Sequence, residues 1–234
     1  MNIPYDKQTV DSPNPLARYA HRSRIKNSVR LALSRLSGGK VLDYGCGSGV
    51  FISTLNSLRP QCAVGYEPYM ADRRSDALPI YSRIGDVEAT GPFSLITLFE
   101  TIEHLSEQET TAFLRTCDRV LSPAGGVLVS GPIEIGPALI AKELSRSLRQ
   151  FELPDYGLGE FLKASVLGVP GARADNIKTS HKGFDFRRAM AFIKTSGWRV
   201  EVLEFGPLPI GTWYGNSQVY LWLTRDPASR PARG

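Results

Sequence analysis

The segment GKVLDYGCGSGVF, residues 39–51, constrains the fold of this chain more than any other. Val41 and Leu42 begin a short apolar run typical of a buried parallel strand, and Asp43 interrupts it. Glycines then follow at alternate positions, and apolar spacing suited to one face of a helix resumes at Val50. Glycine permits positive φ and lets the backbone approach a ligand closely. The segment therefore predicts a strand, a tight glycine turn and a helix.

The spacing of the glycines distinguishes two kinds of nucleotide cofactor. A dinucleotide fingerprint reads G-x-G-x-x-G and places a pyrophosphate at the helix N-terminus. Here Gly45, Gly47 and Gly49 form G-x-G-x-G, and Val50 stands where the third dinucleotide glycine falls. The carboxylate of Asp43, two positions before the first glycine, suits a cationic amino-acid group better than a diphosphate. A glycine turn taken alone would also fit an ordinary strand-to-helix connection.

The segment resembles motif I of the class I S-adenosylmethionine-dependent methyltransferases, and E-x-x-E-H at residues 100–104 resembles the ubiquinone-biosynthesis O-methyltransferases. The resemblance covers residues 38–131 by motif and 184–224 by architecture. It implies an α/β fold, a Rossmann-like doubly wound sheet of seven mostly parallel strands. It also implies an antiparallel edge strand, a helical insertion after strand five, and S-adenosylmethionine as the cofactor.

The resemblance also implies which residues bind the cofactor. Glu67 follows Gly47 by twenty positions, where a doubly wound fold places the acid that binds the ribose hydroxyls. Asp86 and the backbone of Val87 would meet the adenine, although a plain Asp-containing turn would look the same. The predicted cofactor-binding residues are Asp43, Gly45, Cys46, Gly47, Gly49, Glu67, Pro68, Asp86, Val87 and Phe99.

The E-x-x-E-H pattern has two readings. On a helical turn Glu100, Glu103 and His104 share a face, and two carboxylates with an imidazole can hold a divalent cation, as this pattern can in the family it resembles. Many methyltransferases with similar residues have no metal, and an acidic first turn also complements the helix dipole. We predict no metal and keep these three residues as the candidate ligands.

Two histidines are candidate catalytic bases, because an unperturbed imidazole titrates close to neutrality. His104 lies near the expected pocket. His181 closes residues 131–183, a segment too long for a simple connection, with helices expected near 138–151 and 158–168. We expect this insertion to form a lid or a substrate wall. A structural or substrate-positioning role is the alternative for His181.

An apolar stripe at helical spacing predicts a helix from about Pro15 to Leu36. In the superfamily that the chain resembles, such a helix often caps the pocket. Its residues Tyr19, His21 and Arg22 could therefore face the substrate, or they could simply lie on the exposed side.

The chain divides into three expected parts, the second of which contains an insertion. Residues 1–37 form the N-terminal cap helix region, and residues 38–224 form the methyltransferase domain, which contains the insertion at 131–183. A brief third strand is expected at residues 81–84. Residues 225–234 are expected to be a disordered tail.

The net charge of +5 is unevenly distributed. Lys and Arg outnumber Asp and Glu by eight to two in residues 1–40 and by fourteen to nine in 140–234. In residues 41–139 they are outnumbered by twelve to six. The basic flanks could attract an anionic substrate, including RNA, or could be solvated helix faces. No RGG tract or aromatic-interleaved basic run is present, so nucleic acid is not favoured as a partner.

The three cysteines, Cys46, Cys62 and Cys117, are odd in number and widely spaced, which indicates reduced thiols in a cytoplasmic protein. No run is long enough for a membrane span, and the N-terminus lacks the layout of a signal peptide. A homodimer is compatible with the sequence.

We therefore predict an enzyme that transfers methyl from S-adenosylmethionine to a small-molecule or glycan acceptor, at oxygen. A sulfonium is already an activated electrophile, so alignment, exclusion of water and removal of one proton suffice for a hydroxyl acceptor. Two alternatives remain open: an RNA methyltransferase and a non-catalytic, cofactor-binding regulatory subunit.

Overall fold

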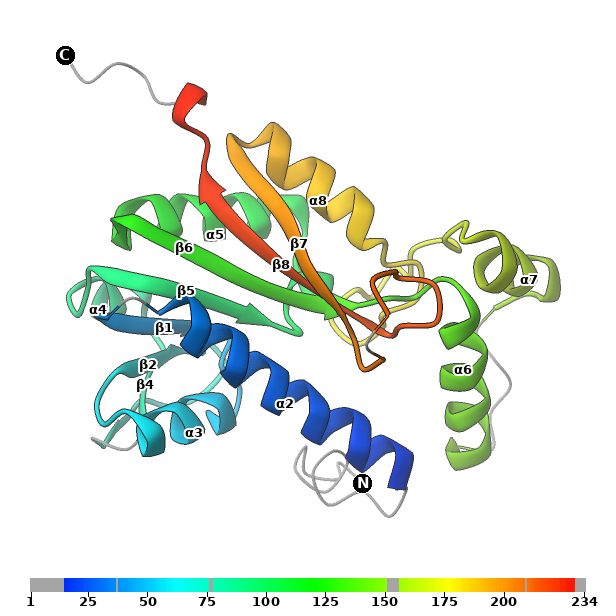
Figure 1. Cartoon of the computed structure of the whole chain (residues 1–234), viewed down its shortest axis with the longest axis horizontal. Helices are drawn as coiled ribbons and strands as arrows, with labels where there is room; N and C mark the ends of the chain where they lie inside the picture. Colours follow the sequence, from blue (N-terminus) through cyan, green and yellow to red (C-terminus); the bar gives the residue numbers. More distant parts are fainter. Residues whose placement is uncertain (1–14, 37, 76–77, 151–155, 209, 230–234) are drawn as a thin grey trace.

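The computed structural model describes residues 15–36, 38–75, 78–150, 156–208 and 210–229, without the side chains of 15–21, 73–75, 145–150 and 229 (Figure 1). One sheet has the strand order β3-β4-β2-β1-β5-β6-β8-β7. Its strands are β1 (Lys40–Tyr44), β2 (Ala63–Tyr66), β3 (Arg73–Ser75), β4 (Leu78–Tyr81), β5 (Phe93–Phe99), β6 (Leu121–Pro132), β7 (Trp198–Gly206) and β8 (Gln218–Arg225).

Helices connect most of these strands. They are α2 (Pro15–Arg35), α3 (Val50–Leu58), α4 (Ile84–Glu88), α5 (Glu107–Val120), α6 (Pro137–Gln150), α7 (Leu158–Leu167) and α8 (Phe186–Thr195). Two short 3-10 helices are η1 (Ile102–His104) and η2 (Pro227–Ser229). The helix predicted from about Pro15 and the two predicted within the insertion are all present.

The sheet confirms the predicted Rossmann-like architecture. Strands β4, β2, β1, β5 and β6 pair in parallel. Strand β8 is antiparallel to both β6 and β7, so β8 and the edge strand β7 form the antiparallel end of the sheet. The sheet contains the seven predicted strands and one more, the short strand β3, which pairs antiparallel with β4. The third strand lies at residues 78–81, three positions before its predicted place, because Ile84 begins α4 instead.

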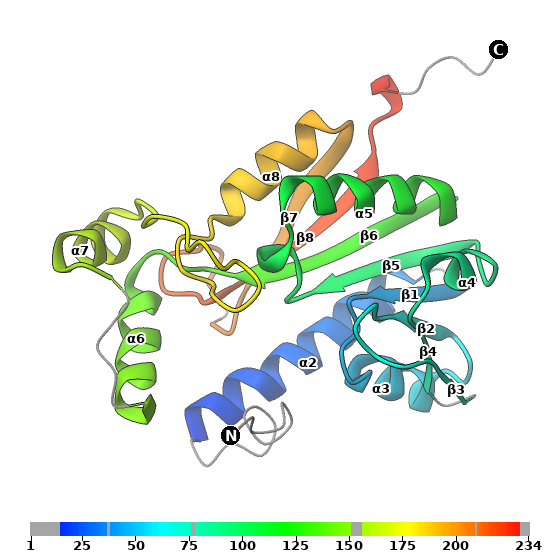
Figure 2. The same ribbon diagram turned by 180° about the vertical axis from the view of Figure 1, so that it is seen from behind.

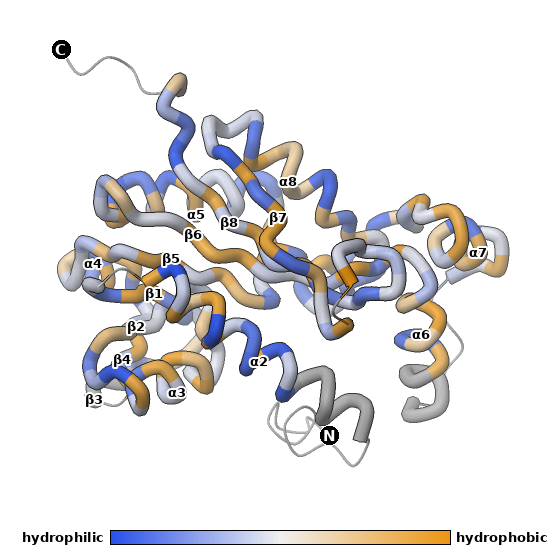
Figure 3. The backbone as a smooth tube through the Cα atoms, in the orientation of Figure 1, coloured by the Kyte–Doolittle hydropathy of each residue, from blue (hydrophilic) through white to orange (hydrophobic). Residues whose placement is uncertain are grey.

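Side chains of the central strands alternate between two cores, one on each face of the sheet. Leu42 of β1 and Ile96 of β5 lie in the core that also contains residues of α5 and α8. Val41 and Leu95, their neighbours in sequence, lie in the core formed with α2 and α3. Figures 1 and 2 show these helix pairs on opposite faces, and Figure 3 shows hydrophobic residues along β5 and β6. The result is a three-layer α/β/α structure.

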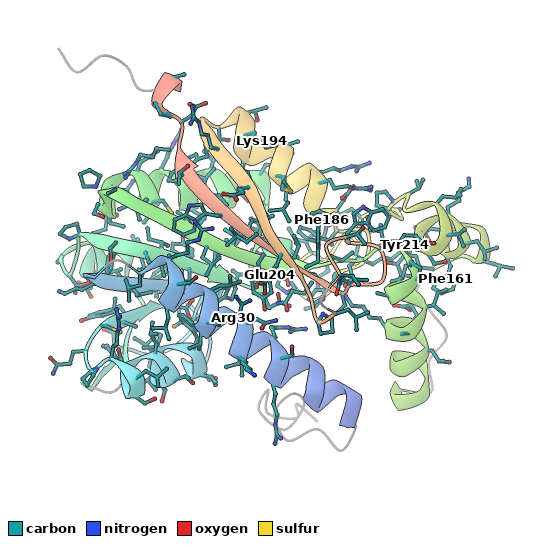
Figure 4. All side chains as sticks on the ribbon, viewed as in Figure 1. Arg30, Phe161, Phe186, Lys194, Glu204 and Tyr214 are labelled. Carbon is teal, nitrogen blue, oxygen red and sulfur yellow. The ribbon has the colours of Figure 1, made fainter. Side chains whose placement is uncertain are left out.

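The second half of α2 is built into this core. Val29 and Ala32 are buried against α3 and the sheet. On the same helix Arg30 forms an ion pair with Glu204 of β7, and the two side chains point toward each other (Figure 4). The predicted cap helix is therefore anchored to the sheet through its C-terminal half.

The insertion lies beyond the carboxyl ends of the parallel strands. Helices α6 and α7 follow β6, and both views place them outside the ends of β5 and β6 (Figures 1 and 2). Leu139, Tyr156 and Ala164 form a small core of their own between these helices. The role of the insertion as a lid stays a prediction.

At the C-terminus, regular structure replaces the first part of the expected disordered tail. Strand β8 extends to Arg225 and η2 follows it. Arg225 donates hydrogen bonds to the carbonyls of Cys117, Asp118, Leu121 and Ser122, which explains its order. Residues 230–234 lie outside the described part of the chain. In the described ranges, no helix combines the length and apolarity needed to cross a bilayer.

Candidate active site

The glycine turn after β1 adopts the backbone that its sequence predicts. Gly45, Gly47 and Gly49 have φ values of 75°, 51° and 84°, in the left-handed region that disfavours residues with a Cβ. The N–H groups of Gly45 and Cys46 donate to the carbonyl of Tyr66 at 2.8 and 3.1 Å. The turn is therefore fixed to the end of β2.

The three glycines differ in what surrounds them. A Cβ added at Gly45 would lie 2.8 Å from Thr101 Cγ2, and one at Gly49 would lie 2.5 Å from Leu78 Cδ1. One added at Gly47 would meet no heavy atom of the described residues within 4 Å. Gly45 and Gly49 thus allow close packing of the protein, while the backbone of Gly47 faces space that a ligand can fill.

Asp43, the last but one residue of β1, is buried directly before this turn. Its side chain is 3% exposed, and Thr97 Oγ1 donates to its Oδ1 at 2.7 Å. Burial raises the pKa of Asp43 to about 7, an effect that the Thr97 hydrogen bond opposes and the charge of Glu67 reinforces. A cationic group placed near Asp43 would favour its ionised form.

Glu67 lies at the end of β2, beside the same turn. Its Oε2 accepts a hydrogen bond from the N–H of Gly47 at 3.0 Å, and its Oε1 accepts one from Tyr69 at 3.3 Å. Pro68 is exposed next to it. The carboxylate is thus held within reach of the open face of Gly47.

The other predicted cofactor residues follow neighbouring strands. Asp86 and the buried Val87 belong to α4, just after β4, and Phe99 ends β5, where it packs edge-to-face on Phe51 with ring centroids 4.9 Å apart. Since β1, β2, β4 and β5 are parallel, their carboxyl ends share one edge of the sheet. All ten predicted residues therefore lie along this edge, which is where open α/β sheets bind ligands.

Glu100 does not join the candidate metal ligands. Its φ of 47° places it outside a helical turn, and η1 begins only at Ile102, so the shared face assumed from E-x-x-E-H does not exist there. The Glu100 carboxylate instead forms an ion pair with Arg24 at 3.1 Å and accepts hydrogen bonds from Gln218 at 2.8 Å and Ser130 at 3.0 Å. Burial alone would raise the pKa of Glu100, but these three partners together lower it.

The structure groups Glu103 and His104 with His181 instead. The nearest ligand-type atoms of these three residues all lie within 4.8 Å of one another. His104 Nε2 and His181 Nε2 are 3.2 Å apart, and His181 Nε2 is 3.7 Å from Glu103 Oε1. Burial, and then the charge of Glu100, raises the pKa of Glu103, while burial lowers that of His181. The two predicted bases are thus neighbours, although they are 77 positions apart in sequence.

Arg173 positions the segment that carries His181. Its guanidinium donates to the carbonyls of Ser180 at 3.3 Å and Lys182 at 2.9 Å, on either side of His181, and also to the carbonyl of Glu103. Sequence reasoning missed Arg173, since a single arginine in a loop carries no local signal. Ser106 and Glu109 were also missed, although S-x-x-E is the recognisable capping box that begins α5.

The structure describes the side chain of only one of the three predicted substrate residues on α2, so their role in substrate binding stays a prediction. Arg22 is exposed, and the side chains of Tyr19 and His21 lie outside the described residues. Among the α2 side chains that the structure describes, Arg24 forms an ion pair with Glu100 at the end of β5.

A family model described as a methyltransferase domain matches residues 16–163, which is more than half of the chain. The chain therefore belongs to the methyltransferase-domain family, which confirms the predicted resemblance to methyltransferases.

The chain is similar in sequence to named O-methyltransferases. The ubiquinone biosynthesis O-methyltransferase of Xanthomonas oryzae pv. oryzae (strain PXO99A) is 31% identical over 119 residues, covering 44% of this chain and 49% of that protein. The enzyme of the same name from Pseudomonas aeruginosa (strain LESB58) is 26% identical over 117 residues, covering 41% and 45%. The chain thus spans about half the length of these relatives.

Solved structures agree on the fold. The DhpI–SAH complex has a TM-score of 0.53 at 14% identity, covering 95% of this chain and 90% of that one. The methyltransferase domain of bacterial CtHen1-CN has a TM-score of 0.54 at 16% identity, covering 87% and 98%. At these identities the likeness shows the fold alone.

Proposed function

We propose that this chain binds S-adenosylmethionine at the glycine turn and transfers its methyl group to a hydroxyl oxygen of a small-molecule or glycan acceptor. The observation that carries the proposal is the open face of Gly47 between the buried Asp43 and the carboxylate of Glu67. An ammonium group would meet Asp43, and a vicinal diol would meet the two acceptor oxygens of Glu67. Asp86 and Val87 would receive the adenine.

The acceptor side lies next to this turn. Thr101, whose side chain lies against Gly45, immediately precedes η1, and η1 ends at His104. His104 and His181 therefore stand close to where a methyl donor on the turn would end, and an imidazole there can take the hydroxyl proton. The names of the relatives from Xanthomonas and Pseudomonas support oxygen as the accepting atom.

Besides proton removal, catalysis requires that the protein position the cofactor and the acceptor. A sulfonium already activates the methyl group, so aligning the two reactants and excluding water account for most of the required rate enhancement. Helices α6 and α7 lie beyond the same sheet edge and are suited to enclose a compact acceptor. Arg24, Gln218 and Ser130 hold the Glu100 carboxylate in place at that edge.

The test pairs cofactor binding with a transfer screen. Purified protein is incubated with methyl-labelled S-adenosylmethionine and panels of phenols, glycans and RNA, and S-adenosylhomocysteine binding is measured by calorimetry. We expect label in a phenol or glycan, binding near wild type in His181→Ala, and transfer reduced by about 100-fold or more in that variant.

Other results would assign the chain differently. Label in RNA alone would support the RNA alternative that the sequence left open. Cofactor binding without transfer to any panel would support a non-catalytic subunit. Absence of cofactor binding would contradict the proposal as a whole.

A further inference from the structure

The loop between α7 and α8 closes on itself at its two ends. The N–H of Ala174 donates to the carbonyl of Lys182 at 3.3 Å, and a Cβ added at Gly183 would lie only 2.5 Å from the carbonyl oxygen of Ala172. Gly183 has a φ of 72°, so the glycine allows the two ends to approach this closely. Residues 172–183 therefore form a compact loop of the Ω type, drawn yellow in Figure 2.

Arg173 lies at the start of this loop and forms hydrogen bonds with its end. Its guanidinium donates to the carbonyls of Ser180 at 3.3 Å and Lys182 at 2.9 Å, which precede and follow His181. A third hydrogen bond reaches the carbonyl of Glu103 in η1. A guanidinium carries five N–H groups in a rigid planar fork, so arginine is suited to join carbonyls from two segments. One side chain thus connects the backbone around His181 to η1.

Two further contacts hold the middle of the loop on η1 and α5. His104 Nδ1 lies 2.7 Å from the carbonyl of Ile177 and must donate to it, since a carbonyl only accepts. Nε2 of a neutral His104 ring is therefore an acceptor, and His181 Nε2 lies 3.2 Å from it. Lys178 pairs with Glu109 at 2.6 Å, but these side chains are 45% and 41% exposed, so the ion pair contributes little.

The residue after His181 is joined to the insertion as well. Lys182 forms an ion pair with Glu160 of α7 at 3.1 Å, and its ammonium lies 5.0 Å from the centre of the Tyr156 ring. These contacts fix the loop against α7, on the side away from its hydrogen bonds to η1. The hydrogen bonds of Arg173 are those that connect the backbone on both sides of His181 to η1, which carries His104.

We propose that Arg173 is a positioning residue for methyl transfer, which it serves by holding His181 against His104. The two imidazoles are 77 positions apart in sequence, and their ring centroids lie 4.9 Å apart. Misplacing a reacting group by about 1 Å can cost about 100-fold in rate, so loosening this loop slows transfer. The role in transfer rests on the proposed function, whereas the placement of His181 by Arg173 does not.

The first experiment measures the placement of His181 without cofactor or acceptor. The chain has three histidines, so labelling with ¹³C,¹⁵N-histidine gives a simple NMR spectrum. We expect a nuclear Overhauser effect between the His104 and His181 rings in wild type. The control Arg188→Gln, which removes an exposed arginine of α8, should keep this effect. In Arg173→Gln it should be lost.

The second experiment asks whether Arg173 acts through His181. With the acceptor found by the labelled-methyl screen, Arg173→Gln should lower kcat by about 10- to 100-fold and leave KM for S-adenosylmethionine near wild type. The double variant with His181→Ala should be no slower than His181→Ala alone, because Arg173 then has no base to position. An arginine that is merely structural would slow both backgrounds by the same factor.

Four results would overturn the inference: no effect between the two rings in wild type, an effect that persists in Arg173→Gln, unchanged kcat in Arg173→Gln, or a double variant slower than His181→Ala by the full factor of the single variant. If Arg173→Gln does not fold, Arg173→Lys gives the same comparison, because its ammonium keeps the charge but lacks the fork. If wild type transfers no methyl group, the proposed function fails, while the ring contact still tests the placement of His181.

Discussion

The N–H of Gly47 donates to the carboxylate of Glu67 across 3.0 Å, which joins two residues that are twenty positions apart in sequence. The bond holds Glu67, the residue after β2, against the one glycine of the turn that has open space where a side chain would lie. The carboxylate is thus preorganised beside the backbone that is expected to meet the cofactor, which reduces the entropy lost on binding.

Replacing Glu67 by Gln should weaken cofactor binding and leave folding nearly unchanged. The amide keeps one acceptor but loses the charge-assisted hydrogen bonds to a diol, worth about 1.5–3 kcal/mol, or about 10- to 150-fold in affinity. Calorimetry with S-adenosylhomocysteine measures this loss, with Glu107→Gln as the control. An unchanged affinity would remove Glu67 from the ribose site.

Gly47→Ala should mainly impair cofactor binding, whereas Gly49→Ala should mainly lower stability. At Gly47 the methyl group enters open space, so the left-handed backbone costs only about 1–2 kcal/mol while cofactor binding is blocked. At Gly49 the methyl group also collides with Leu78 Cδ1 at 2.5 Å, so stability should fall by about 2–4 kcal/mol. Denaturant unfolding and calorimetry on both variants separate the two effects, and equal stability losses would contradict this division of roles.

Cofactor affinity should depend on the ionisation of Asp43. Its pKa of about 7 lies above the ordinary value of 3.8 because burial disfavours the charged form. A cationic ligand binds the charged form, so affinity should rise as pH increases through 7, and binding below pH 7 should release a proton. Calorimetry in buffers of different ionisation enthalpy detects that proton. In Asp43→Asn both the proton release and this rise should disappear.

The same shift has the opposite effect on the cofactor-free fold. A raised pKa means that Asp43 favours folding fully below pH 3.8, and that this contribution is lost as pH rises through about 7. The free energy of unfolding of cofactor-free Asp43→Asn should therefore exceed that of wild type at pH 8. The difference between the two proteins should be smaller at pH 5. Thermal unfolding at the two pH values gives the comparison, and a larger gain at pH 5 would argue against a buried, high-pKa carboxyl.

Arg24 should contribute to stability through Glu100. Removing the guanidinium in Arg24→Met leaves a partly buried carboxylate with one partner fewer, at a cost of about 1–3 kcal/mol. The double variant with Glu100→Gln should be less destabilised than the sum of the single variants, since the unpaired charge is then absent. Strict additivity in denaturant unfolding would show that the two residues do not act as a pair.

Local sequence patterns predicted the elements that local physics determines. The apolar run at residues 93–99, the glycine turn and the α3 stripe each appear where expected, since burial and glycine geometry operate within a few residues. Strand β3 could not be expected from its polar segment, because only pairing with β4 makes it a strand. The third strand was misplaced for a related reason: in Leu78–Tyr81 only Ile80 is fully buried, and Pro79 weakens the strand signal.

Some residues of the candidate site could likewise be predicted from local sequence, and others could not. Asp43 and Glu67 could be predicted because strand ends and chain spacing place them. The grouping of Glu103 with His181 could not, because a loop held by Arg173 creates it. The exclusion of Glu100 depends on a positive φ and on partners from α2, β6 and β8 that no local pattern contains.

Calorimetric titration of the purified chain with S-adenosylmethionine, repeated on Gly47→Ala, tests the central claim most directly. The account predicts one molecule bound per wild-type chain, and a folded Gly47→Ala variant with little or no binding. A wild-type chain that does not take up the cofactor, or a variant that binds it as tightly as wild type, would contradict the placement of the cofactor at this turn.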